Sequence, residues 1–309
     1  MLGFDKFSAA WLMAIMSVKP VTSTLLYAAS HAGTVTTLDL QTSESGTTLK
    51  AIATNTDCAA NPSWLTLDQS KSLLYCADRG LTNPNGTLVS FQKFENGTLE
   101  LLGKLPTIKG AVSSVVYGKN GGGIALASGP RHARFLVTKD KTYFFVLAEL
   151  GNIVTTYEVH YGRNKTLSFT EVFSVGTHGP DSTVPVGAAA AEIHISPDSE
   201  YLIVSSRNVS TFSIPNFDTT NSTEIKSDAL VTFKIDHKTG HLGFTQIFPS
   251  GGMIPRQFSI NKAGTQVAVG LQQDGRAVII DREVSTGLLK GFAANISIAG
   301  EVVCVIFDE

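Results

Sequence analysis

The chain has 309 residues, a formal net charge of −2 and an apolar content of 43%. This length is enough for one large domain or two small ones, and this apolar content supplies a core, so a disordered chain is excluded. Charges of both signs are scattered and no long basic run occurs, which excludes nucleic acid as the expected partner.

Residues 1–23 differ from the rest of the chain. The apolar run 9–16 has the length of the hydrophobic segment of a secretory signal, but Asp5 cancels the charge of Lys6 and no small-residue cleavage site follows. Residues 1–23 are therefore either a signal peptide or a disordered terminus, and residues 24–309 are expected to form the folded domain. No stretch reaches the roughly 18–20 apolar residues that a membrane span needs.

Possible glycosylation sites favour a secreted glycoprotein. Six asparagines occur as Asn-x-Ser/Thr without an intervening proline: Asn85, Asn96, Asn164, Asn208, Asn221 and Asn295. Each falls in a polar turn between apolar segments, where a glycan would have room. The alternative is ordinary asparagine turn chemistry in a cytoplasmic protein.

The cysteine pattern leaves two interpretations open. Cys58 and Cys76 are close enough in sequence to bridge neighbouring strands in an oxidising compartment, but free buried thiols explain them equally well. With Cys304 the count is odd, and the spacing matches no metal site.

The apolar pattern is that of an all-β protein. Short runs rich in Val, Ile, Thr, Phe and Tyr are broken about every 8–12 residues by Gly, Asn, Asp and Ser, which is typical of a sandwich, barrel or propeller. An internal repeat favours the propeller. Four copies read as strand, tight turn, strand, loop, strand, glycine turn and strand, and they begin at Pro62, Arg134, Glu192 and Gln257.

The two ends of the chain fit a closed ring of blades. Segments 24–29 and 34–38 look like the inner strands of a blade that lacks its full set, and segment 302–307 is an unattached apolar strand. We expect segment 302–307 to pair with this first blade, which would close the ring and cover a sheet edge.

One blade is incomplete in the sequence. Segments 112–117 and 124–127 form the opening hairpin of a blade, with Gly121-Gly122-Gly123 as its turn rather than a phosphate loop, and no outer strands follow. The next blade already begins after Ser128. The sequence thus predicts a propeller of about six blades, one of them truncated between Ala127 and Ser128.

Candidate functional residues lie at the entrances of the predicted blades. No nucleophile elbow, P-loop, dinucleotide fingerprint or zinc motif is present. An arginine suits an anionic substrate and a carboxylate can move a proton or orient water. The primary candidates are Arg131, Glu149 and Arg256, and the secondary ones are His132, Glu192 and His194. The alternative is that these side chains tie blades together through buried hydrogen bonds.

Four motifs together resemble the lactonase β-propeller family, which includes bacterial-type 6-phosphogluconolactonase and fungal carboxy-cis,cis-muconate cyclase. They are Gly-Pro-Arg-His at 129–132, Ala-Glu-Leu at 148–150, Ala-Glu-Ile-His-Ile-Ser-Pro-Asp at 191–198 and Pro-Arg-Gln-Phe at 255–258. The resemblance covers residues 24–309. It implies a seven-bladed propeller that acts on a small carboxylated lactone or its open acid, as a monomer without metal or organic cofactor.

The resemblance also suggests roles for three residues. Arg131 and Arg256 match arginines that would hold the substrate carboxylate and stabilise an oxyanion, and Glu149 matches an acid that would handle the proton or orient water.

The family's Pro-His-x-His segment is absent, at the point where the strands of the truncated blade are missing. The sequence therefore leaves two alternative functions. The first is hydrolysis or closure of a lactone ring, and the second is ligand binding by a catalytically impaired propeller that acts as a scaffold. A metal-dependent lactonase would need several Asp, Glu or Asn ligands around the axis, and the sequence does not show them.

Overall fold

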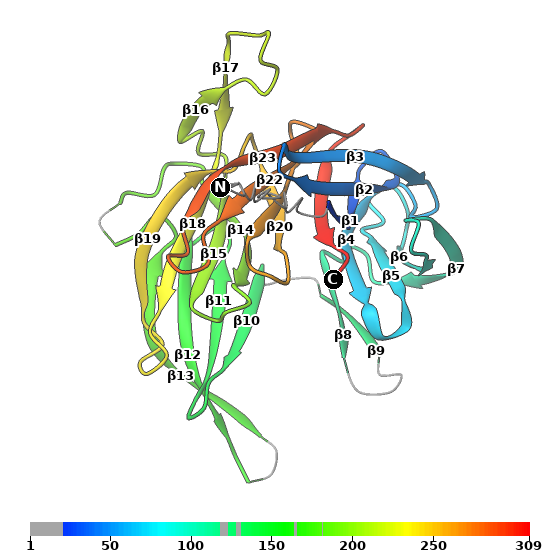
Figure 1. The fold of residues 1–309 in the computed structure, drawn as a ribbon. Coiled ribbons are helices and arrows are strands. Elements are labelled where there is room, and N and C mark those ends of the chain that lie inside the picture. Colours follow the sequence, from blue (N-terminus) through cyan, green and yellow to red (C-terminus); the bar gives the residue numbers. More distant parts are fainter. Residues whose placement is uncertain (1–20, 118–122, 128–130, 164–165, 181) are drawn as a thin grey trace, which may run out of the picture.

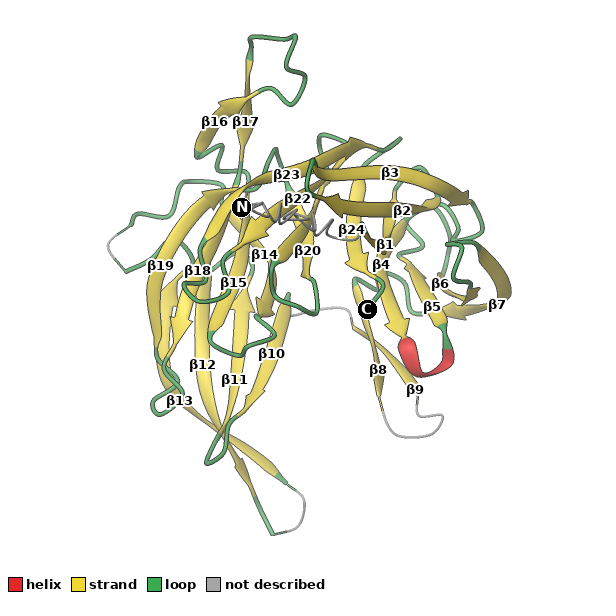
Figure 2. Cartoon of the chain, in the orientation of Figure 1, coloured by secondary structure: helices red, strands yellow, loops and turns green. Residues whose placement is uncertain are grey.

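The computed structural model describes residues 21–309, apart from 118–122, 128–130, 164–165 and 181. The predicted signal region up to residue 20, Gly121, Gly122, Gly129, Pro130 and the sequon Asn164 therefore lie outside the described residues. Within the described residues the regular secondary structure consists of β-strands, and the one helix is a short 3-10 turn, η1 (Gln69–Lys71) (Figure 2). This part of the chain has no helix with the length and apolar character needed to cross a membrane.

Five four-stranded antiparallel sheets form the blades of a propeller (Figure 1). The first blade has the order β24 (Val302–Phe307), β1 (Thr22–Ser30), β2 (Thr34–Ser43), β3 (Gly46–Asn55). The second has β4 (Pro62–Asp68), β5 (Leu73–Asp78), β6 (Gly86–Lys93), β7 (Leu99–Thr107). The third has β10 (His132–Val137), β11 (Thr142–Ala148), β12 (Ile153–Tyr161), β13 (Leu167–Gly176). The fourth has β14 (Ala189–Ile195), β15 (Tyr201–Arg207), β18 (Ala229–Ile235), β19 (Leu242–Pro249). The fifth has β20 (Pro255–Ile260), β21 (Gln266–Leu271), β22 (Arg276–Arg282), β23 (Leu289–Ser297).

The predicted closure by the C-terminal strand is confirmed. Strand β24 pairs antiparallel with β1, with Ala28 opposite Val305, and the hydroxyl of Tyr27 donates a hydrogen bond to Asp308 at 3.0 Å. One detail of the prediction was wrong: segments 24–29 and 34–38 are the second and third strands of the first blade, because β24 is its inner strand and β3 completes it.

The truncated blade is confirmed as well. Strands β8 (Ser113–Tyr117) and β9 (Gly123–Ala127) pair only with each other. This two-stranded sheet is held to the second blade by Thr66, whose hydroxyl donates to the carbonyl of Ser114 at 2.9 Å. The ring thus has five complete blades and one remnant, in agreement with the predicted six blades of which one is truncated.

Four apolar clusters join the five complete blades to one another in a row. They lie between the third and fourth, the fourth and fifth, the fifth and first, and the first and second blades. Within the described part of the chain no such cluster connects the remnant sheet with the third blade. The free face of the third blade therefore exposes large apolar side chains: Phe135 (53%), Val137 (73%), Tyr161 (68%) and Phe169 (47%).

The fourth blade carries an insertion that the sequence did not reveal. Strands β16 (Phe212–Pro215) and β17 (Glu224–Ser227) form a separate hairpin between β15 and β18, and this hairpin stands out from the ring (Figure 1). Phe217 anchors it by packing edge-on against Phe292 of β23, with ring centroids 5.2 Å apart.

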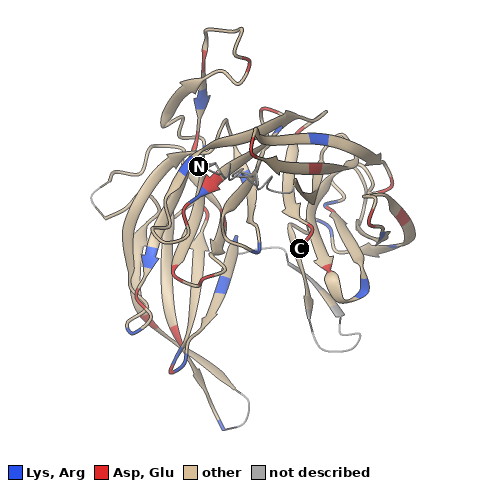
Figure 3. Ribbon diagram, in the orientation of Figure 1, with Lys and Arg blue, Asp and Glu red and all other residues tan. Residues whose placement is uncertain are grey.

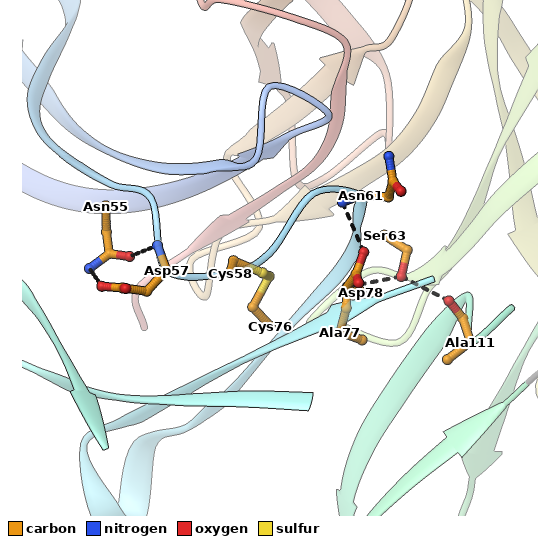
Figure 4. Close-up of a disulfide and its surroundings, with 9 residues drawn as sticks. All are labelled: Asn55, Asp57, Cys58, Asn61, Ser63, Cys76, Ala77, Asp78 and Ala111. Carbon is orange, nitrogen blue, oxygen red and sulfur yellow. Dashed lines mark hydrogen bonds between the residues drawn. A yellow bond between two sulfur atoms is a disulfide. The ribbon is translucent and has the colours of Figure 1, made fainter. Parts of the chain in front are cut away.

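Cys58 and Cys76 form a disulfide, which settles the alternative that the sequence left open (Figure 4). Their Cα atoms are 5.9 Å apart, in the usual range for such a bridge. The bridge ties the loop after β3 to β5, and so joins the first blade to the second. Cys304 is buried and free, as part of the apolar cluster between the same two blades.

Candidate functional site

A polar residue closes the second strand of every complete blade. These residues are His31, Arg79, Glu149, Arg207 and Gln272, which stand at or directly after the ends of β1, β5, β11, β15 and β21. In an antiparallel blade the second strand ends at the edge where the inner strand begins. The same edge therefore also receives Arg131, which precedes β10, and Arg256, the second residue of β20. Elsewhere, charges of both signs are scattered over the blades (Figure 3).

Glu149 lies between two arginines. Its Oε1 accepts a hydrogen bond from Nη2 of Arg207, and its Oε2 is 3.9 Å from Nη1 of Arg131. The carboxylate group is partly open, with 36% of the side chain exposed, whereas both guanidinium groups are largely covered. The arrangement fixes the carboxylate and leaves it a side that faces solvent.

The start of β14 holds both of these arginines. Nε of Arg131 donates to the carbonyl of Ala191 at 3.0 Å, and Arg207 donates to the carbonyls of Ala189 and Ala190, each at 3.3 Å. The small alanine side chains leave room for the arginine side chains. A register shift between Ala190 and Ile193 takes this stretch out of the regular ladder, so that its carbonyls can accept from side chains.

Arg256 is a buried cation without a fixed partner. It is 7% exposed, and no described residue accepts a hydrogen bond from its guanidinium. Burial lowers its pKa to about 9, and the like charges of Arg131, Arg79 and Arg207 act in the same direction. The pKa of Arg131 is lowered by the same causes, burial first and then the charge of Arg207. The guanidinium groups of four arginines, Arg79, Arg131, Arg207 and Arg256, thus act on one another in one region. Glu149 and Glu192 offset part of the charge at Arg131, and Glu301 is influenced by Arg256. The arginines outnumber these carboxylates, so a bound anion would relieve the remaining repulsion.

The electrostatics of Glu149 favour the ionised form. Burial alone would raise its pKa, but the hydrogen bond from Arg207 and the charges of Arg131 and Arg207 outweigh this effect and lower it. Glu149 is therefore a carboxylate at neutral pH. It can accept a proton or orient a water molecule, and it cannot start a reaction as a proton donor.

The secondary candidates form a separate buried network. Oε1 of Glu192, which is fully buried, lies 3.1 Å from Nδ1 of His132 and 3.2 Å from Nη2 of Arg134, and the same Nη2 lies 3.0 Å from Nε2 of His194. Burial would raise the pKa of Glu192, but His132 and Arg134 lower it to about 2. Burial and the charge of Arg134 lower the pKa of His194 to about 3.

This network links the inner strands of the third and fourth blades. His132 also contacts Trp64 of β4, with ring centroids 4.9 Å apart, and so reaches the second blade. The geometry of the network around Glu192 agrees with the alternative interpretation from the sequence, in which these polar side chains hold neighbouring blades together.

The structure brings Arg131, Glu149 and Arg256 into one electrostatic environment, and it adds Arg79 and Arg207, which sequence reasoning missed. The sequence does contain a signal for Arg79 and Arg207, namely their position in the repeat. Arg79 follows Ala77-Asp78 and Arg207 follows Ser205-Ser206, in the place that Glu149 takes after Leu147-Ala148. Alignment of the repeat copies at the end of their second strands would have placed the three together.

Other parts of the described surface have fewer charged groups that could act on a substrate than the region around Glu149. A groove of about 400 Å³ lies at the opposite ends of the strands and is lined by polar residues such as Thr24, Asn261 and Gln266. Among the residues that the structure describes, no group of three His, Cys, Asp or Glu side chains is arranged to hold a metal ion.

Comparison with known families matches nearly the whole described chain. The family described as "Lactonase, 7-bladed beta-propeller" matches residues 21–128 and 124–307. The chain belongs to this family. The match comes as two segments that meet at the truncated blade, where the sequence predicted missing strands.

Two curated proteins that resemble the chain are named as lactonases. "6-phosphogluconolactonase" of Formosa agariphila is 30% identical over 173 residues, which is 56% of this chain and 42% of that protein. "Probable 6-phosphogluconolactonase" of Arthroderma benhamiae is 31% identical over 140 residues, or 44% of this chain and 31% of that protein. The chain spans less than half the length of these relatives.

Solved structures show the same fold. A putative 6-phosphogluconolactonase from Bacteroides fragilis superposes with a TM-score of 0.68 at 16% identity, covering 93% of this chain and 98% of that one. The periplasmic gluconolactonase PpgL of Pseudomonas aeruginosa gives a TM-score of 0.67 at 14% identity, covering 93% and 99%. At these identities the likeness establishes the lactonase-type propeller fold.

Proposed function

We propose that this lactonase-family propeller hydrolyses a small lactone that carries a phosphate or carboxylate group. The observation that carries the proposal is the position of Glu149, an ionised carboxylate held between Arg131 and Arg207 and influenced by the charge of Arg256, for which the described residues supply no ion pair. The names of its relatives support lactone chemistry, and the excess of guanidinium groups over carboxylates supports an anionic substrate.

The reaction follows from these charges. Glu149 orients a water molecule and accepts its proton as the water oxygen bonds to the lactone carbonyl carbon. An arginine stabilises the negative charge that forms on the carbonyl oxygen. The ring C–O bond then breaks, the leaving alkoxide takes up the proton that Glu149 accepted from water, and Glu149 returns to its carboxylate form while the open hydroxy acid leaves. Arg256 holds the anionic substituent. Closure of an open acid would use the same groups in reverse.

The test is acid release from a panel of lactones by the purified chain. The panel contains 6-phosphogluconolactone, the uncharged gluconolactone and a carboxylated muconolactone. We expect hydrolysis of at least one charged lactone at a higher kcat/KM than for gluconolactone. Equal rates for charged and uncharged lactones would contradict the anionic substrate class.

The second candidate function, an impaired propeller that binds anions without turnover, is favoured by one specific observation. The remnant sheet β8–β9 has only two strands, and the Pro-His-x-His segment that the family resemblance leads us to expect is absent from the sequence where its outer strands are missing. Folded protein that binds phosphate but opens none of the lactones would establish this second function.

We further propose that the protein is secreted and glycosylated. The Cys58–Cys76 disulfide supports an oxidising compartment. The described sequon asparagines Asn85, Asn96, Asn208 and Asn221 are exposed. Asn295 is half-buried within strand β23, so the prediction that every sequon falls in a turn was wrong at this position. Mass spectrometry of protein from a eukaryotic host, before and after glycosidase treatment, tests the proposal. An unchanged mass would contradict the glycosylation.

A further inference from the structure

A buried carboxylate outside the arginine group organises the backbone around it. Asp228, at 0% exposure, lies between the hairpin β16–β17 and strand β18. Its Oδ1 accepts hydrogen bonds from the N–H groups of Val209 (2.7 Å) and Ser210 (2.9 Å). Its Oδ2 accepts from Asn208 (3.0 Å) and Ile254 (2.8 Å). Four backbone donors from two separate loops therefore converge on one side chain.

Three of these four donors have an unfavourable backbone conformation. Asn208, Ser210 and Ile254 have positive φ angles of 62°, 45° and 58°. Residues other than glycine seldom adopt this region, and for a β-branched residue such as Ile254 it is a clear outlier. Such strain persists where the surroundings fix the backbone. Here the fixing group is the Asp228 carboxylate.

The two loops carry two arginines of the candidate site. Arg207 directly precedes Asn208, and Arg256 is two residues after Ile254, beyond Pro255. The main chain of Asp228 adds two further links to the second loop, because its N–H donates to Gly252 (2.9 Å) and its carbonyl accepts from Ser250 (2.9 Å). The backbone that flanks both arginines is thus anchored by one shared residue, Asp228.

We propose that Asp228 is a positioning residue that holds Arg207 and Arg256 in register for one anionic ligand. The proposal rests on the proposed function for its substrate, but the positioning itself does not require turnover. Asp228 touches neither arginine side chain through a hydrogen bond in the described structure, so it acts through the strained backbone of Asn208–Ser210 and Ile254.

The test compares Asp228→Asn with wild type. The amide keeps the size of the side chain but replaces one acceptor oxygen by a donor, so one pair of N–H groups loses its acceptor. Asp236→Asn is the matched control. Asp236 flanks the other end of β18, is exposed, and also accepts backbone N–H bonds, from Lys238 at 2.8 Å and Thr239 at 3.3 Å.

Two readouts are measured, amide hydrogen exchange and the affinity for inorganic phosphate. We expect exchange of peptide 207–211 to accelerate at least about tenfold in Asp228→Asn, because each of the two oxygens accepts from an N–H group of this peptide, and phosphate affinity to fall by about tenfold or more. Exchange of peptide 252–257 should accelerate as well where the amide nitrogen replaces Oδ2, which accepts from Ile254. The Asp236→Asn control should change neither. In an Arg207→Gln, Arg256→Gln background, Asp228→Asn should have little further effect on phosphate affinity.

Several outcomes would overturn the proposal. They are unchanged exchange at 207–211, equal phosphate affinity of wild type and Asp228→Asn (including binding by neither), and an undiminished effect in the double-arginine background. A wild-type protein that binds phosphate as expected but hydrolyses no lactone would contradict the proposed function alone and leave the role of Asp228 standing.

Discussion

The carboxylate of Glu149, at the end of one blade, accepts a hydrogen bond from the guanidinium of Arg207, at the equivalent position of the next blade. The two residues are 58 positions apart in the chain. The pair crosses a blade boundary, so the candidate site depends on how the third and fourth blades pack.

Replacement Glu149→Gln should lower kcat for lactone hydrolysis by roughly a hundredfold or more, because the amide cannot accept a proton. The amide oxygen can still accept the hydrogen bond from Arg207, so the fold should persist. Steady-state kinetics with a thermal melt tests both statements. The control is Glu158→Gln, which removes a carboxylate of the same blade that pairs with Lys141 at 2.9 Å. Equal activity of the two variants would refute the role of Glu149.

Replacement Arg256→Met should weaken phosphate binding by about tenfold or more, since it removes a charge-assisted contact. The melting temperature should not fall, because the change also removes a buried cation that lies among like charges. Calorimetric titration with phosphate measures the affinity, and a thermal melt measures the melting temperature.

Arg282→Met is the contrasting control for Arg256. Arg282 is also buried, but it donates to the carbonyl of Gly264 at 2.8 Å and pairs with Asp198 at 3.4 Å. Its loss should lower the melting temperature and leave phosphate affinity unchanged. A loss of phosphate affinity in Arg282→Met with none in Arg256→Met would contradict the assignment of Arg256 to the anion site and of Arg282 to the fold.

The fold should be sensitive to acid through the Glu192 network. The lowered pKa of Glu192, about 2 against an ordinary 4.5, contributes stability that is lost as the pH falls from 4.5 toward 2. The lowered pKa of His194, about 3 against 6.5, means that the unfolded chain takes up a proton first, so stability already falls below pH 6.5. Each group adds a slope of at most about 1.4 kcal/mol per pH unit.

Urea unfolding at several pH values tests the acid sensitivity. In His194→Gln the slope between about pH 6.5 and the onset of Glu192 titration should flatten, because the histidine proton is no longer part of the equilibrium. A slope that is identical in wild type and variant would show that His194 is not responsible.

Removal of the Cys58–Cys76 bridge should lower the free energy of unfolding by about 3 kcal/mol, as expected for a short closed loop. The cysteines are 18 residues apart. The measurement is urea unfolding of wild type with and without a reductant, beside a Cys58→Ala, Cys76→Ala variant. Reductant should destabilise wild type and leave the variant unchanged. An effect of reductant on the variant would point to Cys304 instead.

The free face of the third blade should bind a hydrophobic dye such as ANS in the folded state. Phe135 stacks on Phe144 at 4.3 Å, and Phe144 contacts Phe169 at 5.6 Å, so the face is a continuous aromatic surface. Phe135→Ser with Phe169→Ser should reduce dye fluorescence severalfold with little loss of melting temperature. Unchanged fluorescence would place the dye elsewhere.

The order of strands could be predicted from the sequence because each blade repeats its apolar runs and turn residues. The missing strands after Ala127 and the pairing of segment 302–307 follow from the same repeat. The hairpin β16–β17 escaped prediction because its strands are only four residues each, with little period to detect.

The site was predictable only in part. Arg131, Glu149 and Arg256 stand in recognisable motifs, whereas Arg79 and Arg207 matter through their position at the ends of second strands. The role of Asp228 depends on backbone angles at Asn208, Ser210 and Ile254, which no sequence pattern encodes.

The open side of the ring makes this propeller a linear array with two ends. In a closed ring every blade has an apolar cluster on both faces, but among the residues that the structure describes the third blade has such a cluster on one face only, and the fifth and first blades lie in the middle of the row. Arrays of this kind fray from their termini. Arg131 and Glu149 belong to the terminal blade and Arg256 to a central one. Detachment of a single blade would therefore dismantle the anion site while most of the molecule stays folded.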